Sequence, residues 1–166
     1  MDTTEETSIH ELFEKIKDIK MCMLTTHVIP EGIMRSRPMA TLKAEEETSF
    51  IYFFTNDVSA KVEEIDSEQQ VCLSYMDMSK ELYISVSGTA NFSYDKEKMK
   101  QLWNPMLKAW FPEGIEDPNL AIIKIKPSQA EYWDAPDNKM NQLFGMARAI
   151  VTGSEYNEGE NKKINL

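Results

Sequence analysis

The feature that most constrains the fold of this chain is a succession of short β-forming segments separated by turns of a few polar residues. The densest segment, residues 49–55, reads Ser-Phe-Ile-Tyr-Phe-Phe-Thr, and aromatic and β-branched residues are enriched in strands. Short turns between successive strands favour antiparallel pairing, and closure into a barrel hides the edges of such a sheet. The pattern predicts six strands, at residues 21–28, 34–44, 49–55, 70–78, 81–94 and 121–126, the last extended by 130–133.

Helices are predicted beside these strands. Ser8 and Glu11 have the spacing of a capping box, in which each side chain accepts a hydrogen bond from a free amide of the first helical turn. Apolar residues at positions 9, 12, 13 and 16 then follow helical spacing, which predicts an amphipathic helix over residues 8–20. Further helices are predicted at residues 59–68, 95–109 and 138–151.

We therefore expect a mainly β protein, a six-stranded antiparallel split β-barrel with flanking helices. Its single domain spans residues 1–152, and the polar residues 153–166 form a flexible tail.

The charge balance narrows the possible partners. The chain has 166 residues, with 18 Lys and Arg against 28 Asp and Glu, a formal net charge of −10. This charge argues against nonspecific binding to duplex nucleic acid or to anionic membranes, which both need basic surfaces. No apolar run reaches the length of a membrane span. The two cysteines, Cys22 and Cys72, lie in apolar runs and predict free buried thiols in a cytoplasmic protein.

A cluster of cations stands out in the acidic half of the chain. Alternation along the predicted strand 34–44 puts Arg35, Arg37 and Lys43 on one face, together with Met39 and Thr41. Such a face either forms salt bridges, since glutamates follow at positions 45–47, or binds an anion.

The segment from Phe54 to Lys61 favours the anion. A strand end, a tight turn and a helix start follow one another here, and free amides at a helix N-terminus attract anions. Thr55 and Ser59 supply hydroxyls and Lys61 a charge, a mixture suited to a phosphate monoester, although a Ser-capped helix alone would explain Ser59. Met39, Tyr52 and Phe53 or Phe54 form an apolar wall nearby. The two elements together predict a planar heteroaromatic ligand with a phosphate tail.

Several motifs in order resemble one family. They are Arg37-Pro38-Met39-Ala40-Thr41-Leu42, Phe53-Phe54-Thr55 with Ser59-Ala60-Lys61, Val86-Ser87-Gly88-Thr89-Ala90, Leu102-Trp103-Asn104-Pro105, Trp110-Phe111-Pro112-Glu113-Gly114, Asp117-Pro118 and Glu131-Tyr132-Trp133-Asp134. Over residues 8–135 the chain resembles the general stress protein branch of the pyridoxamine 5′-phosphate oxidase-like flavin-binding split barrels.

The resemblance implies a homodimer with a flavin, FMN or FAD, bound between the subunits. Carried over by position, the strand residues of the site line the flavin, the next pair flanks its ring and ribityl chain, and the turn holds its phosphate. Trp110 closes the site from the partner subunit. The strand residues are Arg37, Met39, Ala40 and Thr41, the flanking pair is Phe54 and Thr55, and the turn consists of Ser59, Ala60 and Lys61.

Two departures from the family pattern bear on activity. Ala60 stands where true pyridoxamine phosphate oxidases have an arginine, and the C-terminal residues 161–166 contain no arginine. We therefore expect flavin binding without pyridoxamine phosphate oxidation.

Three functions stay open. The first is a flavin-dependent oxidoreductase that transfers electrons or hydride to or from a small molecule. The second is a flavin carrier or stress sensor without turnover. The third, a small barrel that binds single-stranded nucleic acid, is opposed by the net charge. The sequence supports no metal site and names no catalytic acid or base.

Overall fold

A single antiparallel sheet of eight strands forms the body of the protein. The computed structural model describes residues 3–28, 31–45, 47–56, 69–135, 139–155 and 159–166. The strand order is β2-β1-β5-β6-β7-β4-β3, and β8 pairs with β7. The strands are β1 (Met21–Val28), β2 (Ile33–Ala40), β3 (Lys43–Glu45), β4 (Phe50–Asn56), β5 (Gln69–Asp77), β6 (Leu82–Ser93), β7 (Leu120–Asp134) and β8 (Glu160–Asn165).

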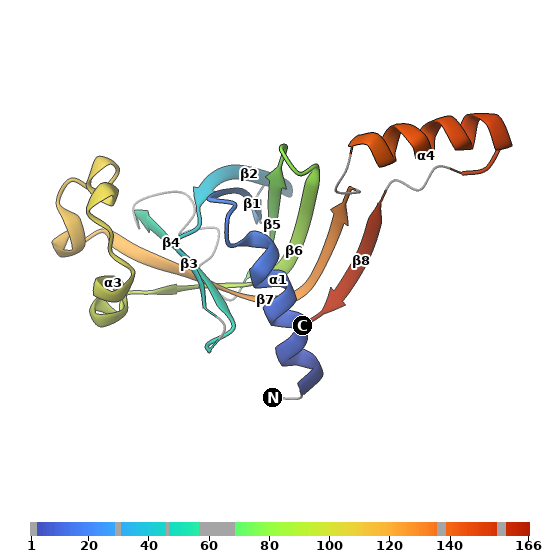
Figure 1. The fold of residues 1–166 in the computed structure, drawn as a ribbon. Coiled ribbons are helices and arrows are strands. Elements are labelled where there is room, and N and C mark those ends of the chain that lie inside the picture. Colours follow the sequence, from blue (N-terminus) through green and yellow to red (C-terminus); the bar gives the residue numbers. More distant parts are fainter. Residues whose placement is uncertain (1–2, 29–30, 46, 57–68, 136–138, 156–158) are drawn as a thin grey trace.

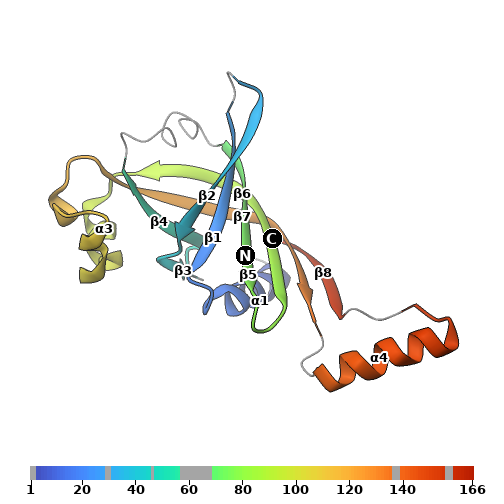
Figure 2. The ribbon, with the colours of Figure 1, turned by 90° about the horizontal axis from the view of Figure 1, so that it is seen from above.

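The sheet curls on itself (Figures 1 and 2). Alternate side chains along its strands point into the core. In β1, Cys22, Leu24, Thr26 and Val28 are buried while the residues between them face outward or lie at intermediate depth, the period-2 pattern of a half-buried strand. The long strands β6 and β7 change register between Ser87 and Gly88. A Cβ atom on Gly88 would lie 2.5 Å from the Lys126 carbonyl oxygen, so only glycine permits this close approach of the two backbones.

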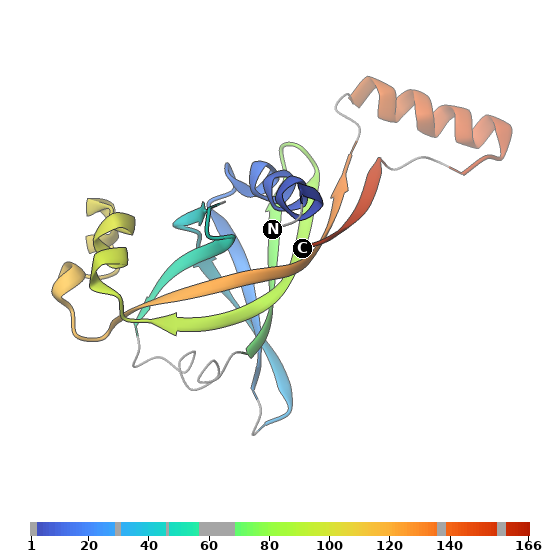
Figure 3. The same cartoon turned by 90° about the horizontal axis from the view of Figure 1, so that it is seen from below.

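Helices lie at the margins of this sheet. They are α1 (Thr3–Ile16), α3 (Lys96–Leu102) and α4 (Lys139–Thr152), with two short 3-10 helices, η1 (Pro105–Ala109) and η2 (Gly114–Glu116). Figures 1 and 3 show α3 and α4 at opposite ends of the molecule. In the part of the chain that the structure describes, no helix has the length and apolar character needed to cross a membrane.

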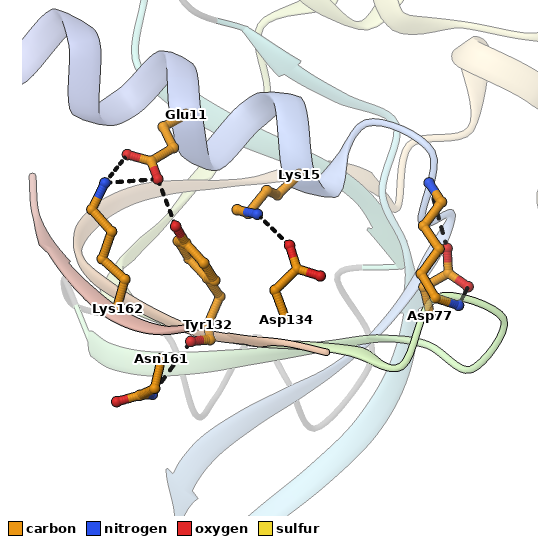
Figure 4. A network of polar contacts seen from close by, with 8 residues as sticks. Glu11, Lys15, Asp77, Tyr132, Asp134, Asn161 and Lys162 are labelled. Atoms are coloured by element: carbon orange, nitrogen blue, oxygen red, sulfur yellow. Dashed lines mark hydrogen bonds and ion pairs between the residues drawn. The ribbon is translucent and has the colours of Figure 1, made fainter. Parts of the chain in front are cut away.

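Helix α1 is fixed to the barrel by an apolar face and by polar contacts. Leu12, Phe13 and Ile16 are buried in the main core. Glu11 accepts hydrogen bonds from the Tyr132 hydroxyl at 2.8 Å and from Lys162 Nζ at 2.7 Å, and the latter bond is the main reason that the pKa of Glu11 is lowered (Figure 4). These contacts join α1 to β7 and β8.

The fold confirms the mainly β class with antiparallel pairing, but the strand count differs. We expected six strands, and the described residues form eight. The predicted strand 34–44 is divided into β2 and β3 because the chain changes its partner strand: the Thr41 amide still follows the β1 register and donates to the Lys20 carbonyl oxygen at 2.9 Å, whereas the Leu42 amide donates to the Tyr52 carbonyl oxygen of β4 at 2.9 Å.

The predicted helix 95–109 is also divided. It ends as α3 at Leu102, and the chain resumes as η1, whose first residue is Pro105. Proline clashes with a preceding helical turn and provides no amide for its ladder, which explains the break. The predicted helix 59–68 lies outside the described residues.

The expectation of a loose tail after residue 152 is wrong for residues 160–165. They form β8 and pair with β7 from Gln129 to Asp134, and Ile164 is buried in the main core. The surrounding lysines and asparagines are exposed, so one apolar residue on the inner face accounts for the burial of this otherwise polar segment.

Candidate functional site

The barrel is open between β2 and β4. In the described part of the chain, β2 pairs only with β1, and β3 covers only Phe50, Ile51 and Tyr52 of β4. The end of β4 therefore extends beyond β3 and faces the free edge of β2. A cavity of about 410 Å³ lies here. Its lining residues are Met21 of β1, Pro38, Met39 and Ala40 of β2, Leu42 between β2 and β3, Phe54, Thr55 and Asn56 of β4, and Leu107, Trp110 and Phe111 of the η1 segment.

Aromatic side chains pack against the β4 wall of this cavity. The Phe54 ring packs against Trp103 with centroids 5.7 Å apart and against Phe111 at 6.1 Å. These rings belong to a second apolar cluster that also contains the buried Met99 and Leu120. The segment from α3 to Phe111 thus packs on β4 and brings Leu107, Trp110 and Phe111 to the cavity.

Thr55 places a poorly satisfied hydroxyl at the cavity. The residue is only 2% exposed, and among the described residues its one hydrogen bond is a long contact of 3.5 Å to the Asn56 carbonyl oxygen. Buried polar groups are nearly always hydrogen-bonded, and one left unpaired costs about 1–3 kcal/mol. A polar ligand in the cavity would satisfy this group.

The predicted cationic face is only partly formed. Arg37 lies two positions before Met39 on the same face of β2, and its Nη2 donates to Thr26 Oγ1 at 2.7 Å. Arg35 lies 3.8 Å from Glu31. Lys43 belongs to β3 and binds Glu45 at 3.0 Å, so the expectation of three cations on one strand is wrong.

Thr41 does not line this cavity. Its hydroxyl lies 3.0 Å from the Tyr75 hydroxyl, and the residue lines a neighbouring groove instead. Burial raises the pKa of Tyr75 well above its ordinary value, so this phenol is a neutral hydrogen-bonding group.

Trp110 lies at the cavity rim of its own chain and is 72% exposed. Four further predicted residues, Met39, Ala40, Phe54 and Thr55, line the same cavity. Ser59, Ala60 and Lys61 lie outside the described residues. Leu107 and Asn56 were not predicted; Phe111 and Pro38 stood in the quoted motifs without an assigned role.

Comparison with known proteins decides the family. The model of the family described as "Pyridoxamine 5′-phosphate oxidase like" matches residues 7–157. The chain belongs to this family. Its match to the protein bli-3 of Neurospora crassa has 29% identity over 156 residues, which covers 89% of this chain and 75% of bli-3.

Solved structures confirm the split-barrel fold. A candidate general stress protein 26 from Jannaschia sp. CCS1 has a TM-score of 0.75 at 23% identity and covers 95% of this chain and 97% of its own. A general stress FMN/FAD binding protein from Xanthomonas citri has a TM-score of 0.68 at 24% identity and covers 81% of this chain and 92% of its own. The resemblance in the motifs is thus confirmed at the level of family and fold.

Proposed function

We propose that this family member binds a flavin, as FMN or as the FMN half of FAD, in the cavity between β2 and β4. The observation that carries the proposal is the buried Thr55 hydroxyl beside an apolar hollow that also contains Met39 and Phe54. The cavity volume of about 410 Å³ falls in the range of cofactor sites, roughly 300–1,000 Å³. The family and the FMN/FAD binding protein of Xanthomonas citri support the assignment.

The lining residues have properties that suit the parts of a flavin. Met39, Phe54 and Phe111 offer apolar surface to a planar ring system. The free edge of β2 offers backbone donors and acceptors to the polar edge of that ring, and Thr55 offers its hydroxyl. Arg37 would hold the phosphate, together with the predicted Ser59, Ala60 and Lys61.

A bound flavin supplies electron or hydride transfer. We infer a flavin-dependent oxidoreductase that acts with a small-molecule donor or acceptor. The alternative is a flavin carrier or stress sensor, for which the same residues bind the flavin without turnover. The free thiols of Cys22 and Cys72 favour the reducing cytoplasm as its compartment.

We also propose a homodimer that covers the outer face of the sheet. Large apolar side chains are exposed across the five adjacent strands β2, β1, β5, β6 and β7, a patch of the kind that marks protein interfaces. Register places Met21 of β1 opposite Ala40, and Tyr83 opposite both Met76 and Trp133. Met21 also lines the cavity, so a second copy on this face would lie beside the flavin. The exposed residues are Met21, Met23, Met34, Met76, Tyr83 and Trp133.

Titration of the colourless apoprotein with FMN and with riboflavin tests the site. Arg37→Ala should weaken FMN binding by tenfold or more, since a charge-assisted contact is worth about 1.5–3 kcal/mol, and should leave riboflavin binding nearly unchanged. Lys61→Ala should act in the same way, whereas the matched control Arg148→Ala in α4 should affect neither ligand. Thr55→Val should weaken both ligands.

The outcomes separate the hypotheses. A protein that binds neither flavin refutes the proposal, and equal losses for both ligands in Arg37→Ala refute the phosphate role of this residue. Flavin reduction by NADH or NADPH supports the oxidoreductase, and tight binding without reduction or oxidase activity supports the carrier.

The dimer is tested by sedimentation. Met23→Glu should produce a monomer with weaker FMN binding, because it places a charge in the proposed interface. Met78→Glu, at a more exposed position in the turn after β5, should leave the dimer intact. A monomeric native protein would refute this part.

A further inference from the structure

A second and larger hollow adjoins the flavin cavity. It lies between the C-terminal end of α1, the link from β2 to β3, and η1, and its volume is about 670 Å³. We call it the α1 groove. Ala40, Leu42 and Leu107 line both hollows, so the groove and the cavity share a wall.

The lining of the α1 groove is apolar where it meets the barrel. Phe13, Ile16 and Ile19 are buried side chains of the main core, and Leu102 and Leu107 are half-buried. A groove with this lining favours a ring or another compact apolar group, because burial of apolar surface is the main driving force for such binding.

Lysines gather around the apolar part. Lys17, Lys20 and Lys43 line the groove against one acidic residue, Glu14. Glu14 is paired with Lys17 in an exposed contact. In the described part of the chain, Lys20 has no ion-pair partner.

The third lysine is only partly neutralised. Lys43 shares Glu45 with Lys98, whose Nζ lies at 2.6 Å, closer than the 3.0 Å of Lys43. The α1 groove is thus a local cationic site in a chain whose net charge is −10. Its charge selects an anion against the field of the rest of the molecule.

We propose that the α1 groove binds a small aromatic anion, an aryl carboxylate or a ligand of the same shape and charge. The ring lies on the apolar lining, and the carboxylate faces Lys20 and Lys17. This site goes beyond the proposed flavin binding and does not depend on it. Because the two hollows share a wall, the ligand and the flavin bind next to each other without sharing a site.

Calorimetric titration with 2-naphthoate, and with the neutral 2-naphthamide as its matched ligand, tests the proposal. The native protein should bind one naphthoate per chain and should bind the amide more weakly. Lys20→Gln should weaken naphthoate binding by about two- to fivefold, the range for an exposed charge pair, and Lys17→Gln should do likewise. Neither variant should change amide binding, and the matched control Lys80→Gln, in the turn after β5, should change nothing.

A rim residue gives a second, independent variant. Met106 lines the α1 groove but not the flavin cavity and is 76% exposed, so its substitution leaves the core intact. Met106→Glu should weaken naphthoate by repulsion, and Met106→Gln should not.

Three results of these calorimetric titrations would overturn the proposal. They are the absence of binding at millimolar naphthoate, equal affinity for the acid and the amide, and identical affinity in Lys17→Gln, Lys20→Gln and Lys80→Gln. Outright displacement of bound FMN by naphthoate would also overturn it, because the probe would then occupy the flavin cavity. Naphthoate binding by a protein that binds no FMN would refute the proposed function but would support the proposed ligand site in the α1 groove.

Discussion

Replacing Glu45 with glutamine should loosen the η1 wall of the flavin cavity from the sheet. Glu45 is the last residue of β3 and accepts hydrogen bonds from Lys98 Nζ at 2.6 Å, from Lys43 Nζ at 3.0 Å and from Thr48 Oγ1 at 2.9 Å. Its side chain is only 11% exposed. Lys98 belongs to α3, so this carboxylate ties the edge of the sheet to the segment that carries Trp110.

The size of the effect follows from the pKa of Glu45. The hydrogen bond from Lys98 lowers this pKa from 4.5 to about 2, with smaller contributions from Lys43 and Thr48 and with burial acting in the opposite direction. One pKa unit corresponds to about 1.36 kcal/mol, so the ionised group stabilises the fold by about 3 kcal/mol at neutral pH. Glu45→Gln keeps the shape of the side chain and removes this contribution.

Urea unfolding of the native protein and of Glu45→Gln, at pH 7 and at pH 3, measures the effect. A lowered pKa stabilises the fold above the unfolded-state value of 4.5, and this stabilisation is lost as the pH falls toward 2. The difference in unfolding free energy should therefore shrink from about 3 kcal/mol at pH 7 to roughly half of that at pH 3. FMN affinity at pH 7 should fall as well, because the wall moves.

Glu97→Gln is the matched control, since Glu97 pairs with Lys100 at 2.8 Å but is 78% exposed. This variant should unfold almost like the native protein at both pH values. The reasoning fails if Glu45→Gln costs no more than Glu97→Gln, or if its cost is the same at pH 3 as at pH 7.

Two further predictions concern the barrel itself. Gly88→Ala should lower the unfolding free energy by about 1–3 kcal/mol, because the new Cβ would lie 2.5 Å from the Lys126 carbonyl oxygen. Calorimetry of this variant and of Ser87→Ala, a substitution at an exposed position, checks the prediction. Equal melting temperatures of the two variants would contradict it. Burial raises the pKa of Cys22 to about 11, so roughly one thiol in a thousand is ionised at pH 8. Ellman's reagent should therefore leave Cys22 unmodified until the protein unfolds. The variant Cys22→Ser identifies the part of the labelling that belongs to this residue. Rapid labelling of Cys22 in the native protein would refute the argument.

The strands with clear alternation could be predicted from the sequence. The predicted bounds of β1, residues 21–28, agree with the structure because its buried and exposed positions alternate and a turn follows. β8 could not be predicted, since its only buried residue is Ile164 and its partner strand β7 begins 40 residues earlier in the chain. Pairing over such a separation leaves little local signal.

Residues of the candidate site could likewise be predicted only where a local sequence pattern marks them. Met39, Ala40, Phe54 and Thr55 could be identified because their two segments follow each other along the chain and carry family motifs. Leu107 reaches the cavity only through the break at Pro105 and the packing of the chain after it on Phe54. That placement depends on tertiary contacts and not on a local pattern.

The break between β2 and β3 is also what makes the cavity. β3 pairs Lys43 with Tyr52 and Glu45 with Phe50. If residues 34–44 were one straight strand, the same register would continue along β4 and set Ala40 opposite Thr55. The backbones would then lie about 4.7–4.9 Å apart, with no room for a planar ligand. Instead Thr41 continues the β1 register through its hydrogen bond to the Lys20 carbonyl oxygen, pairing with β4 begins only at Leu42, and β2 keeps a free edge across the cavity from Phe54 and Thr55. The irregularity that alternation fails to predict is therefore the physical origin of the proposed binding site.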